Sequence, residues 1–340
     1  MRQLAIVRYG TAGEAFRLLE AKDPTPRDFQ VLVEVEGFGL NYADVMARKG
    51  LYREAPNIPF VPGYEVVGKV VDKGSEVPDA IVGKRVVAFT RFGGYADRAL
   101  VDYRALVPIP EAMPAGEACA LATQYCTAYF MSNYLTRLQA GDLALIHACA
   151  GGVGTALTQL CRMQGVRVIG LCGRDEKLAY LEEMGVEWPI NYRAVNYVKA
   201  VEREFGKRKL DLIFNSVAGK SIKRDLKLLA PGGRLFCYGG SDRSGQKKNL
   251  LSDLAFLLKT GFLSPLFMMM KSQGLIGVNM LRVADQRIDT IGACLQALVS
   301  LWEKEAIRPQ IGASFPVADI AAAHRLLESG TSRGKVYVYW

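Results

Sequence analysis

Three glycines that lie close together are the first residues whose type and spacing could do chemistry. Gly151, Gly152 and Gly154 stand in the stretch HACAGGVGTAL, between the apolar run Leu143–His147 and a helical pattern over Val153–Gln164. Residues without side chains let the backbone turn tightly and bring a helix N-terminus, with its free N–H groups, close to a phosphate. This setting of strand, turn and helix predicts contacts to the pyrophosphate of a dinucleotide from the three glycines and Val153.

The glycine turn departs from the usual GxGxxG spelling in one position, because Ala148 stands where the first glycine is expected. A tight turn that holds no ligand is the alternative interpretation. The chain beyond residue 140 favours the nucleotide, because strand and helix patterns alternate there as in a doubly wound parallel sheet. The further strand patterns are Val166–Cys172, Leu210–Asn215 and Arg234–Tyr238, and the helical patterns are Glu176–Met184 and Ser221–Leu229.

The residues after the second of these strands indicate which dinucleotide is bound. NAD enzymes place an acidic side chain there, whereas NADP enzymes place cations for the 2′-phosphate. Gly173 occupies that position, and Arg174 and Lys177 follow it. Arginine binds a phosphate through two parallel hydrogen bonds, and lysine adds a point charge. The pattern predicts NADPH, with Tyr192 and Arg193 closing over the same phosphate.

Asp175 is the residue of this turn that argues against NADPH, since an acid could bind ribose hydroxyls. We interpret it as the N-cap of a helix that begins at Glu176. Its carboxylate would then face the helix backbone rather than a cofactor.

The composition is that of a globular protein with a positive net charge. Of 340 residues, 50% are hydrophobic and 23% are charged, with a formal charge of +9, which excludes a disordered chain. The basic run GKRKL at 206–210 contains no aromatic residue and fits no nucleic-acid motif, so we expect a solvated surface and no nucleic-acid partner. The first apolar stretch is too short for a secretory signal, and no CxxC pair occurs. These features predict a cytoplasmic protein with reduced thiols.

The most apolar segment is Leu250–Lys271, which Asp253, Lys259, Gly261 and Pro265 interrupt. A membrane-spanning helix needs about 20 mostly apolar residues. We therefore interpret the segment as a buried helix and a loop that lines a pocket. A weak contact with a membrane surface is the alternative.

Several motifs together resemble the medium-chain dehydrogenase/reductase superfamily. In chain order they are GLNYADVMARKGLY (39–52), PGYEVVGKV (62–70), GGYADRALV (93–101), AGGVG and GVEWPINYR. Within the superfamily they are similar to the zinc-free quinone oxidoreductases. The segments YGGSDRSGQKKNLL and 250–271 look most similar to the vesicle amine transport protein homologues. The resemblance covers nearly the whole chain.

This resemblance implies an α/β fold in which a Rossmann-type doubly wound parallel sheet accompanies a β-rich GroES-like catalytic domain. It implies that residues 1–124 and 277–340 form the catalytic domain and that residues 125–276 form the NADP(H)-binding domain. The alternating valines of QVLVEVEGFGLN agree with a β-rich first part. The resemblance also implies a homodimer.

The residues that hold zinc in alcohol dehydrogenases of this superfamily are replaced here. The position of the cysteine ligand reads Asn41, and that of the histidine ligand reads Tyr64. Catalytic zinc needs three ligands from Cys, His or carboxylates, so the sequence predicts no metal. Without a Lewis acid, the favoured substrates are those that accept hydride without one, namely quinones and α,β-unsaturated carbonyls.

Hydrogen-bond donors would then stabilise the negative charge that develops on the substrate oxygen. The predicted catalytic residues are Asn41, Tyr52 and Tyr64. The resemblance places Asn41 and Tyr52 near the nicotinamide, although a tyrosine can equally be a packed core residue. Strand ends and the resemblance add further cofactor contacts: Asn41, Thr127, Ser216, Tyr238, Gly239 and Lys335.

Together these features predict a zinc-independent oxidoreductase that transfers a hydride from NADPH to a quinone or an α,β-unsaturated carbonyl. Two alternatives stay open. One is a nucleotide-binding, membrane-associated protein with little turnover, and the other is a reductase of enoyl thioesters. The fold alone does not choose among them.

Overall fold

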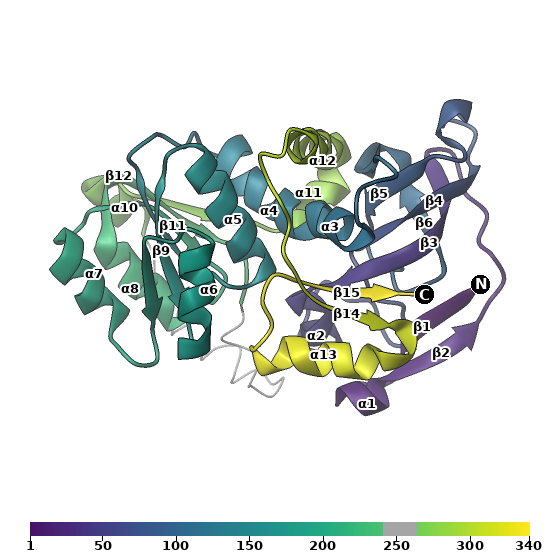
Figure 1. Cartoon of the computed structure of the whole chain (residues 1–340), viewed down its shortest axis with the longest axis horizontal. Coiled ribbons are helices and arrows are strands. Elements are labelled where there is room, and N and C mark those ends of the chain that lie inside the picture. The colour runs from purple at the N-terminus through teal and green to yellow at the C-terminus, as the bar shows by residue number, and fades with distance from the viewer. Residues whose placement is uncertain (241–263) are drawn as a thin grey trace. The chain divides into compact units, whose positions relative to one another are not determined.

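The computed structural model describes residues 1–240 and 264–340. These residues form two compact units, one of residues 1–127 and 280–340 and the other of residues 128–279. Each unit has its own sheet and its own helices (Figure 1). Both ends of the chain belong to the first unit.

The first unit is built on a seven-stranded sheet. Its strand order is β14-β15-β3-β4-β5-β7, and β6 pairs with β3. The C-terminal strand β15 pairs with β3 in antiparallel fashion, so the last residues of the chain complete a sheet that begins near residue 30. The bounds are β3 Gln30–Leu40, β4 Glu65–Lys73, β5 Arg85–Phe89, β6 Arg98–Asp102, β7 Leu106–Pro108, β14 Ile311–Pro316 and β15 Lys335–Tyr339.

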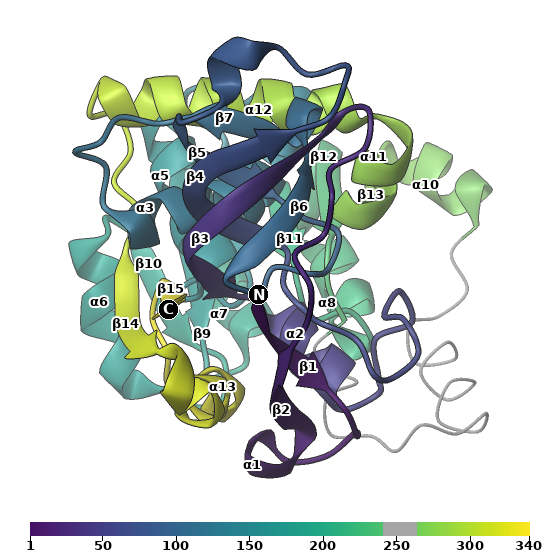
Figure 2. The ribbon, with the colours of Figure 1, turned by 90° about the vertical axis from the view of Figure 1, so that its right-hand side faces the viewer.

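Short helices and a hairpin surround this sheet. The hairpin joins β1 (Arg2–Ile6) and β2 (Phe16–Glu20). Helix α13 (Ile320–Ser329) packs against α1 and α2, as Figure 2 shows. The remaining helical bounds are α1 Ala12–Ala15, α2 Tyr42–Arg48, α3 Ala115–Ala120, α11 Met280–Gln286 and α12 Ile288–Glu303.

Helix α2 escaped the sequence analysis for a physical reason. It has seven residues, and those from Asp44 to Arg48 are all buried, so no polar face alternates with an apolar one. Residues 115–134 form one continuous helical stretch, in which two π-helical turns, Leu121–Tyr125 and Phe130–Tyr134, flank α4 (Cys126–Tyr129).

The second unit contains the predicted parallel sheet, with strand order β10-β9-β8-β11-β12-β13. From β8 the chain winds outward to β10, then returns to β11 on the other side of β8. The winding direction therefore reverses between β8 and β11, and sheets of this kind bind ligands beyond the carboxyl ends of the strands at that point. The bounds are β8 Leu143–Ile146, β9 Arg167–Cys172, β10 Trp188–Asn191, β11 Leu210–Asn215, β12 Leu229–Cys237 and β13 Gly274–Gly277.

Helices cover both faces of this sheet (Figure 1). The pair α7 and α8 packs on one face, where Tyr197, Val201 and Ile222 join the core formed by side chains such as Leu145 and Ile213. The pair α5 and α6 lies on the other face. The bounds are α5 Gly152–Met163, α6 Leu178–Glu183, α7 Tyr197–Phe205, α8 Lys220–Leu228 and α10 Pro265–Lys271.

The apolar segment Leu250–Lys271 lies largely outside the described residues, and only its end is seen, as Ser264 and helix α10. No helix within residues 1–240 and 264–340 combines the length and the apolar character that crossing a membrane requires.

Candidate functional site

The glycine turn lies at the carboxyl end of β8 and leads into α5. Ala148, which replaces the expected first glycine, nevertheless takes the left-handed conformation with φ of +48°. The Gly151 N–H donates to the Ala148 carbonyl over 2.9 Å. A Cβ at Gly154 would lie 2.6 Å from that carbonyl oxygen, so only glycine allows this close approach. Gly151 is the N-cap of α5 and carries no side chain, so the first N–H groups of the helix remain available to an anion.

The cations predicted for the 2′-phosphate follow β9. The parallel pairing of β9 and β10 puts Cys172 opposite Asn191, so the residues after the two strands lie side by side. A Cβ at Gly173 would lie 2.9 Å from the Tyr192 hydroxyl and 3.3 Å from Arg193 Nε. The absence of a side chain at Gly173 therefore lets Tyr192 and Arg193 pack directly against this turn. Five predicted residues gather around this turn: Gly173, Arg174, Lys177, Tyr192 and Arg193.

Asp175 does not cap a helix, contrary to our interpretation of the sequence. It begins a short 3-10 turn for which Arg174 is the N-cap position, and α6 starts only at Leu178. Its Oδ1 instead accepts a hydrogen bond from Asn191 Nδ2 over 2.8 Å. The carboxylate is thus bound to the end of β10.

Three other predicted residues follow the neighbouring strands β11 and β12. The Tyr238 N–H donates to the Asn215 carbonyl over 3.1 Å. A Cβ at Gly239 would lie 2.6 Å from the Ser216 carbonyl oxygen. Because β11 also pairs with β8, Ser216, Tyr238 and Gly239 lie at the same edge of the sheet as the glycine turn.

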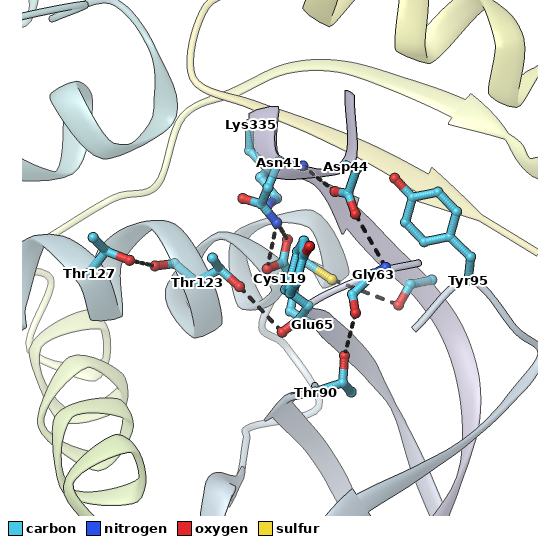
Figure 3. A network of polar contacts seen from close by, with 12 residues as sticks. Asn41, Asp44, Gly63, Glu65, Thr90, Tyr95, Cys119, Thr123, Thr127 and Lys335 are labelled. Atoms are coloured by element: carbon cyan, nitrogen blue, oxygen red, sulfur yellow. Dashed lines mark hydrogen bonds and ion pairs between the residues drawn. The ribbon is translucent and has the colours of Figure 1, made fainter. Parts of the chain in front are cut away.

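In the first unit, three polar residues meet because their strands are neighbours (Figure 3). Strand β3 pairs with β15 on one side and with β4 on the other, both antiparallel. Lys335 begins β15, Asn41 follows the end of β3 and Glu65 begins β4, so all three lie at one edge of the sheet. Gly39 on β3 makes room for them, because a Cβ there would collide with both Lys335 and Glu65.

The amide of Asn41 is fully engaged in this group. Its Nδ2 donates to the two Glu65 oxygens over 2.8 and 2.9 Å, and its Oδ1 accepts from Lys335 Nζ over 3.3 Å. Lys335 also forms an ion pair with Glu65, and both side chains are fully buried. An ammonium only donates and a carboxylate only accepts, so the two partners fix the orientation of the amide.

Asp44 joins the same group through the start of α2. Its Oδ2 accepts from the Asn41 N–H over 2.8 Å, and its Oδ1 accepts from the Gly63 N–H over 3.2 Å. Burial raises the pKa of Asp44 to about 7, although both backbone bonds oppose the shift. Burial also raises the pKa of Glu65, while the Lys335 ammonium opposes that rise.

Tyr52 and Tyr64 lie close together in this unit. Their ring centroids are 6.2 Å apart and their planes are nearly perpendicular, at 79°. The Tyr64 hydroxyl is buried and, apart from a weak interaction with the Tyr52 hydroxyl, has no hydrogen-bond partner among the described residues. Burial raises the pKa of Tyr52 to about 12 and that of Tyr64 well above its ordinary value. Both hydroxyls therefore remain protonated at neutral pH and can donate.

Thr127 connects to this region through one further residue. Its Oγ1 donates to the Thr123 carbonyl over 2.6 Å, and the Thr123 hydroxyl donates to the Tyr64 carbonyl over 3.3 Å (Figure 3). The Thr127 hydroxyl oxygen can still accept a hydrogen bond.

The side chains at the two positions that hold zinc in the alcohol dehydrogenases do not suit a zinc ion. Asn41 and Tyr64 stand where ligands are needed, and the ammonium of Lys335 neutralises the nearby Glu65 carboxylate. Across the part of the chain that the structure describes, no three His, Cys, Asp or Glu side chains lie close enough to hold a metal. All seven cysteines are free thiols.

Sequence reasoning missed several residues of both units. Asp44 follows Asn41 by three residues, the spacing of a capping box, and this signal was available. Asp225 lies between Ile222 and Leu228 on the buried stripe of α8. A carboxylate on such a stripe needs partners, and this was a second available signal.

Comparison with known families gives two matches. Residues 27–111 match the alcohol dehydrogenase GroES-like domain, and residues 152–287 match the zinc-binding dehydrogenase family. The second match overlaps the nucleotide-binding sheet described above.

Individual relatives span nearly the whole chain. A synaptic vesicle membrane protein VAT-1 homolog of Danio rerio is 31% identical over 98% of this chain and 69% of its own length. A quinone oxidoreductase of Rattus norvegicus is 30% identical over 99% of this chain and 97% of its own length. A mycobacterial protein solved in complex with NADPH is 25% identical, with a TM-score of 0.84 and full coverage of both chains.

Proposed function

This chain belongs to the medium-chain dehydrogenase/reductase superfamily, in the branch of the quinone oxidoreductases and VAT-1 homologues, and from that premise we propose that it transfers a hydride from NADPH to a quinone or an α,β-unsaturated carbonyl. One observation carries the proposal. At the carboxyl ends of the paired strands β8 and β9, an uncapped helix N-terminus lies beside a turn that carries cations. The NADPH complex of the mycobacterial relative supports the choice of cofactor.

The proposed cofactor contacts follow from this edge of the sheet. The turn before α5 would bind the pyrophosphate, and the turn after β9 would bind the 2′-phosphate. Bound NADPH supplies the hydride. The proposed contacts of the second unit are Gly151, Gly152, Val153, Gly154, Gly173, Arg174, Lys177, Tyr192, Ser216, Tyr238 and Gly239. Of the contacts predicted in the first unit, Thr127 keeps an acceptor, whereas the side chains of Asn41 and Lys335 are engaged with Glu65.

The chain's own contribution to the reaction is to donate hydrogen bonds and to hold the donors in place. We propose that Tyr52 and Tyr64 donate to the substrate oxygen, where negative charge develops. The burial of the Tyr64 hydroxyl beside Tyr52, with no well-formed hydrogen bond, supports this role, since such a group is costly unless something binds it. Asn41 takes part through its bonds to Glu65 and Lys335, which fix the start of α2. No zinc is proposed, because the residues at the ligand positions do not fit it.

We expect Tyr64→Phe to lower kcat about tenfold, the effect of losing one hydrogen bond in the transition state. The same change removes a buried hydroxyl that has no well-formed hydrogen bond, so the free energy of unfolding should stay equal or rise by about 1 kcal/mol. Steady-state kinetics and urea unfolding check the two expectations together.

Tyr95→Phe is the matched control, because the Tyr95 hydroxyl is equally buried but lies 3.2 Å from His324 Nε2. This variant should lose stability and keep kcat. A Tyr64→Phe enzyme with full kcat on every acceptor would remove Tyr64 from the reaction.

The proposed function is tested by following NADPH oxidation at 340 nm, with NADH in parallel, against quinones, enones and acyl thioesters. Turnover that prefers NADPH and quinones or enones is the expected result. Turnover far higher on acyl thioesters would instead identify an enoyl-thioester reductase. The homodimer implied by the resemblance and the cytoplasmic location expected from the cysteines and the first residues stay predictions.

A second candidate function rests on exposed apolar side chains of α10. Four of them are 57 to 72% exposed: Leu266, Phe267, Met269 and Met270. Together with Lys271 and the net charge of +9, they suit the surface of an anionic membrane. Phe262, which the apolar segment also contains, lies outside the described residues.

We expect Phe267→Ser with Met270→Ser to abolish co-sedimentation with anionic liposomes, because membrane affinity of a short helix depends on its buried apolar area. NADPH oxidation should be unchanged. Leu18→Ser with Leu19→Ser is the control, since these exposed leucines lie on β2. Equal binding of all three proteins, or no binding of the unmodified protein, would contradict the membrane role.

A further inference from the structure

A buried carboxylate in the second unit binds side chains from three different elements. Asp225 on α8 is fully buried. It accepts from Tyr197 Oη of α7 over 2.8 Å and from Asn215 Nδ2, at the end of β11, over 2.5 Å. His147 Nε2, at the end of β8, lies 3.0 Å from it. A carboxylate can only accept, so this contact places a hydrogen on His147 Nε2.

Asn215 continues the connection into the turn between β11 and α8. Its Oδ1 accepts from the N–H groups of Val217 and Ala218 over 2.7 and 2.8 Å. Ala218 has a φ of +62°, a left-handed conformation that is unfavourable for a residue with a side chain. The bond from Asp225 orients the Asn215 amide so that its oxygen holds this strained turn.

His147 makes the corresponding connection to the glycine turn. It directly precedes Ala148, whose φ is +48°, and its N–H donates to the Phe214 carbonyl of β11 over 2.9 Å. Two turns that each contain a non-glycine residue in a left-handed conformation are therefore tied to one carboxylate. Backbone strain of this kind persists only where the surroundings hold it, and it is concentrated at functional sites.

These two turns lie where the winding direction of the sheet reverses, between β8 and β11. We propose that Asp225 is a positioning residue for the cofactor, which holds both turns so that the N–H groups at the start of α5 and Ser216 meet a dinucleotide. The proposal rests on the proposed function. It adds that nucleotide affinity depends on a side chain beneath the turns that does not itself touch the nucleotide.

Three variants separate this role from a merely structural one. Asp225→Asn keeps the size of the side chain but introduces donors that face the donors of Asn215, Tyr197 and His147. The double variant Asp225→Asn/Asn215→Asp exchanges the two groups. The amide now at position 225 donates to the carboxylate now at position 215, and that carboxylate can still accept from the N–H groups of Val217 and Ala218. Tyr197→Phe is the control, because it removes one bond to Asp225 without touching either turn.

Two measurements are made on the full chain well below its melting temperature: the Kd for NADPH by titration calorimetry, and amide hydrogen exchange of the turns at 147–154 and 215–219 without nucleotide. We expect Asp225→Asn to raise the Kd about tenfold, the effect of one lost hydrogen bond, and to speed exchange in both turns. The exchanged pair should bind within about threefold of the unmodified protein. Tyr197→Phe should lower the melting temperature while the Kd and the exchange of both turns stay unchanged.

The proposal is wrong if Asp225→Asn binds NADPH like the unmodified protein, or if Tyr197→Phe raises the Kd by the same factor. Should Asp225→Asn fail to fold, Asn215→Ser replaces it, since this change removes the amide that connects Asp225 to the turn, together with its bonds to Ser221, Val217 and Ala218. Absence of NADPH binding by the unmodified protein would overturn the proposed function as well. That outcome is distinct, because it appears before any variant is made.

Discussion

Replacing Arg174 and Lys177 by alanine should weaken NADPH binding about 100-fold and leave NADH affinity within about threefold, because NADPH alone carries the 2′-phosphate and each charge-assisted bond is worth about 1.5 kcal/mol or more. Both residues follow β9, beside the turn that contains Tyr192. Titration of each nucleotide onto the double variant, monitored by nucleotide fluorescence, measures both constants.

The control variant is Lys207→Ala with Lys209→Ala. It removes two positive charges from an exposed part of the same unit, so it reproduces any general effect of the lower net charge. Its affinity for both nucleotides should match that of the unmodified protein. Equal losses of NADPH and NADH affinity in Arg174→Ala/Lys177→Ala would contradict the assignment of the 2′-phosphate site.

The second large effect concerns stability. Lys335→Met should lower the free energy of unfolding by about 3–5 kcal/mol, because it leaves the fully buried Glu65 carboxylate without its cation. Asn41 Oδ1 loses a donor at the same time. The double variant Lys335→Met/Glu65→Gln should recover most of the loss, since no buried charge then remains unpaired. Urea unfolding of the unmodified protein, Lys335→Met, Glu65→Gln and the double variant completes this double-mutant cycle.

The loss in Lys335→Met should also depend on pH. Burial raises the pKa of Glu65 and Lys335 opposes that rise, so removing the lysine leaves burial unopposed and raises this pKa further. A carboxyl whose pKa is raised in the folded state stabilises the fold at low pH and loses that contribution as pH increases. The deficit relative to the unmodified protein should therefore be larger at pH 8 than at pH 5.

Lys73→Met is the control for these measurements, because Lys73 pairs with the exposed Asp79. Exposed pairs contribute about 0–1 kcal/mol, so its effect should be small at both pH values. A similarly small effect of Lys335→Met would contradict the prediction that the buried Glu65 carboxylate needs the Lys335 ammonium for the stability of the fold.

Much of the nucleotide-binding unit could be predicted because its signals are local. The run Leu210–Asn215 is apolar and ends where β11 ends, and the glycines that follow β8 are adjacent in the chain. Alternation of such segments specifies a parallel sheet, and right-handed connections then specify its winding. Cations directly after β9 could be assigned to a phosphate for the same reason.

Local sequence signals failed to predict the structure where contacts with distant segments decide it. Helix α2 has no exposed face to create a period, and Asp175 carries the residue type of an N-cap without being one, because Asn191 on the next strand binds its carboxylate. In both cases packing from outside the segment overrides the local preference.

By itself, the sequence determined the alternation of strands and helices beyond residue 140, the turn at Gly151–Gly154 and the cations after the next strand. Only the tertiary structure decided how the polar residues are used. It joins Asn41 to Lys335 across 294 residues and His147 to Asp225 across 78 residues, and so turns a predicted donor into part of a buried network. The reason is physical: periodicity shows which face of a segment is buried, whereas strand register and helix packing determine which buried polar groups meet.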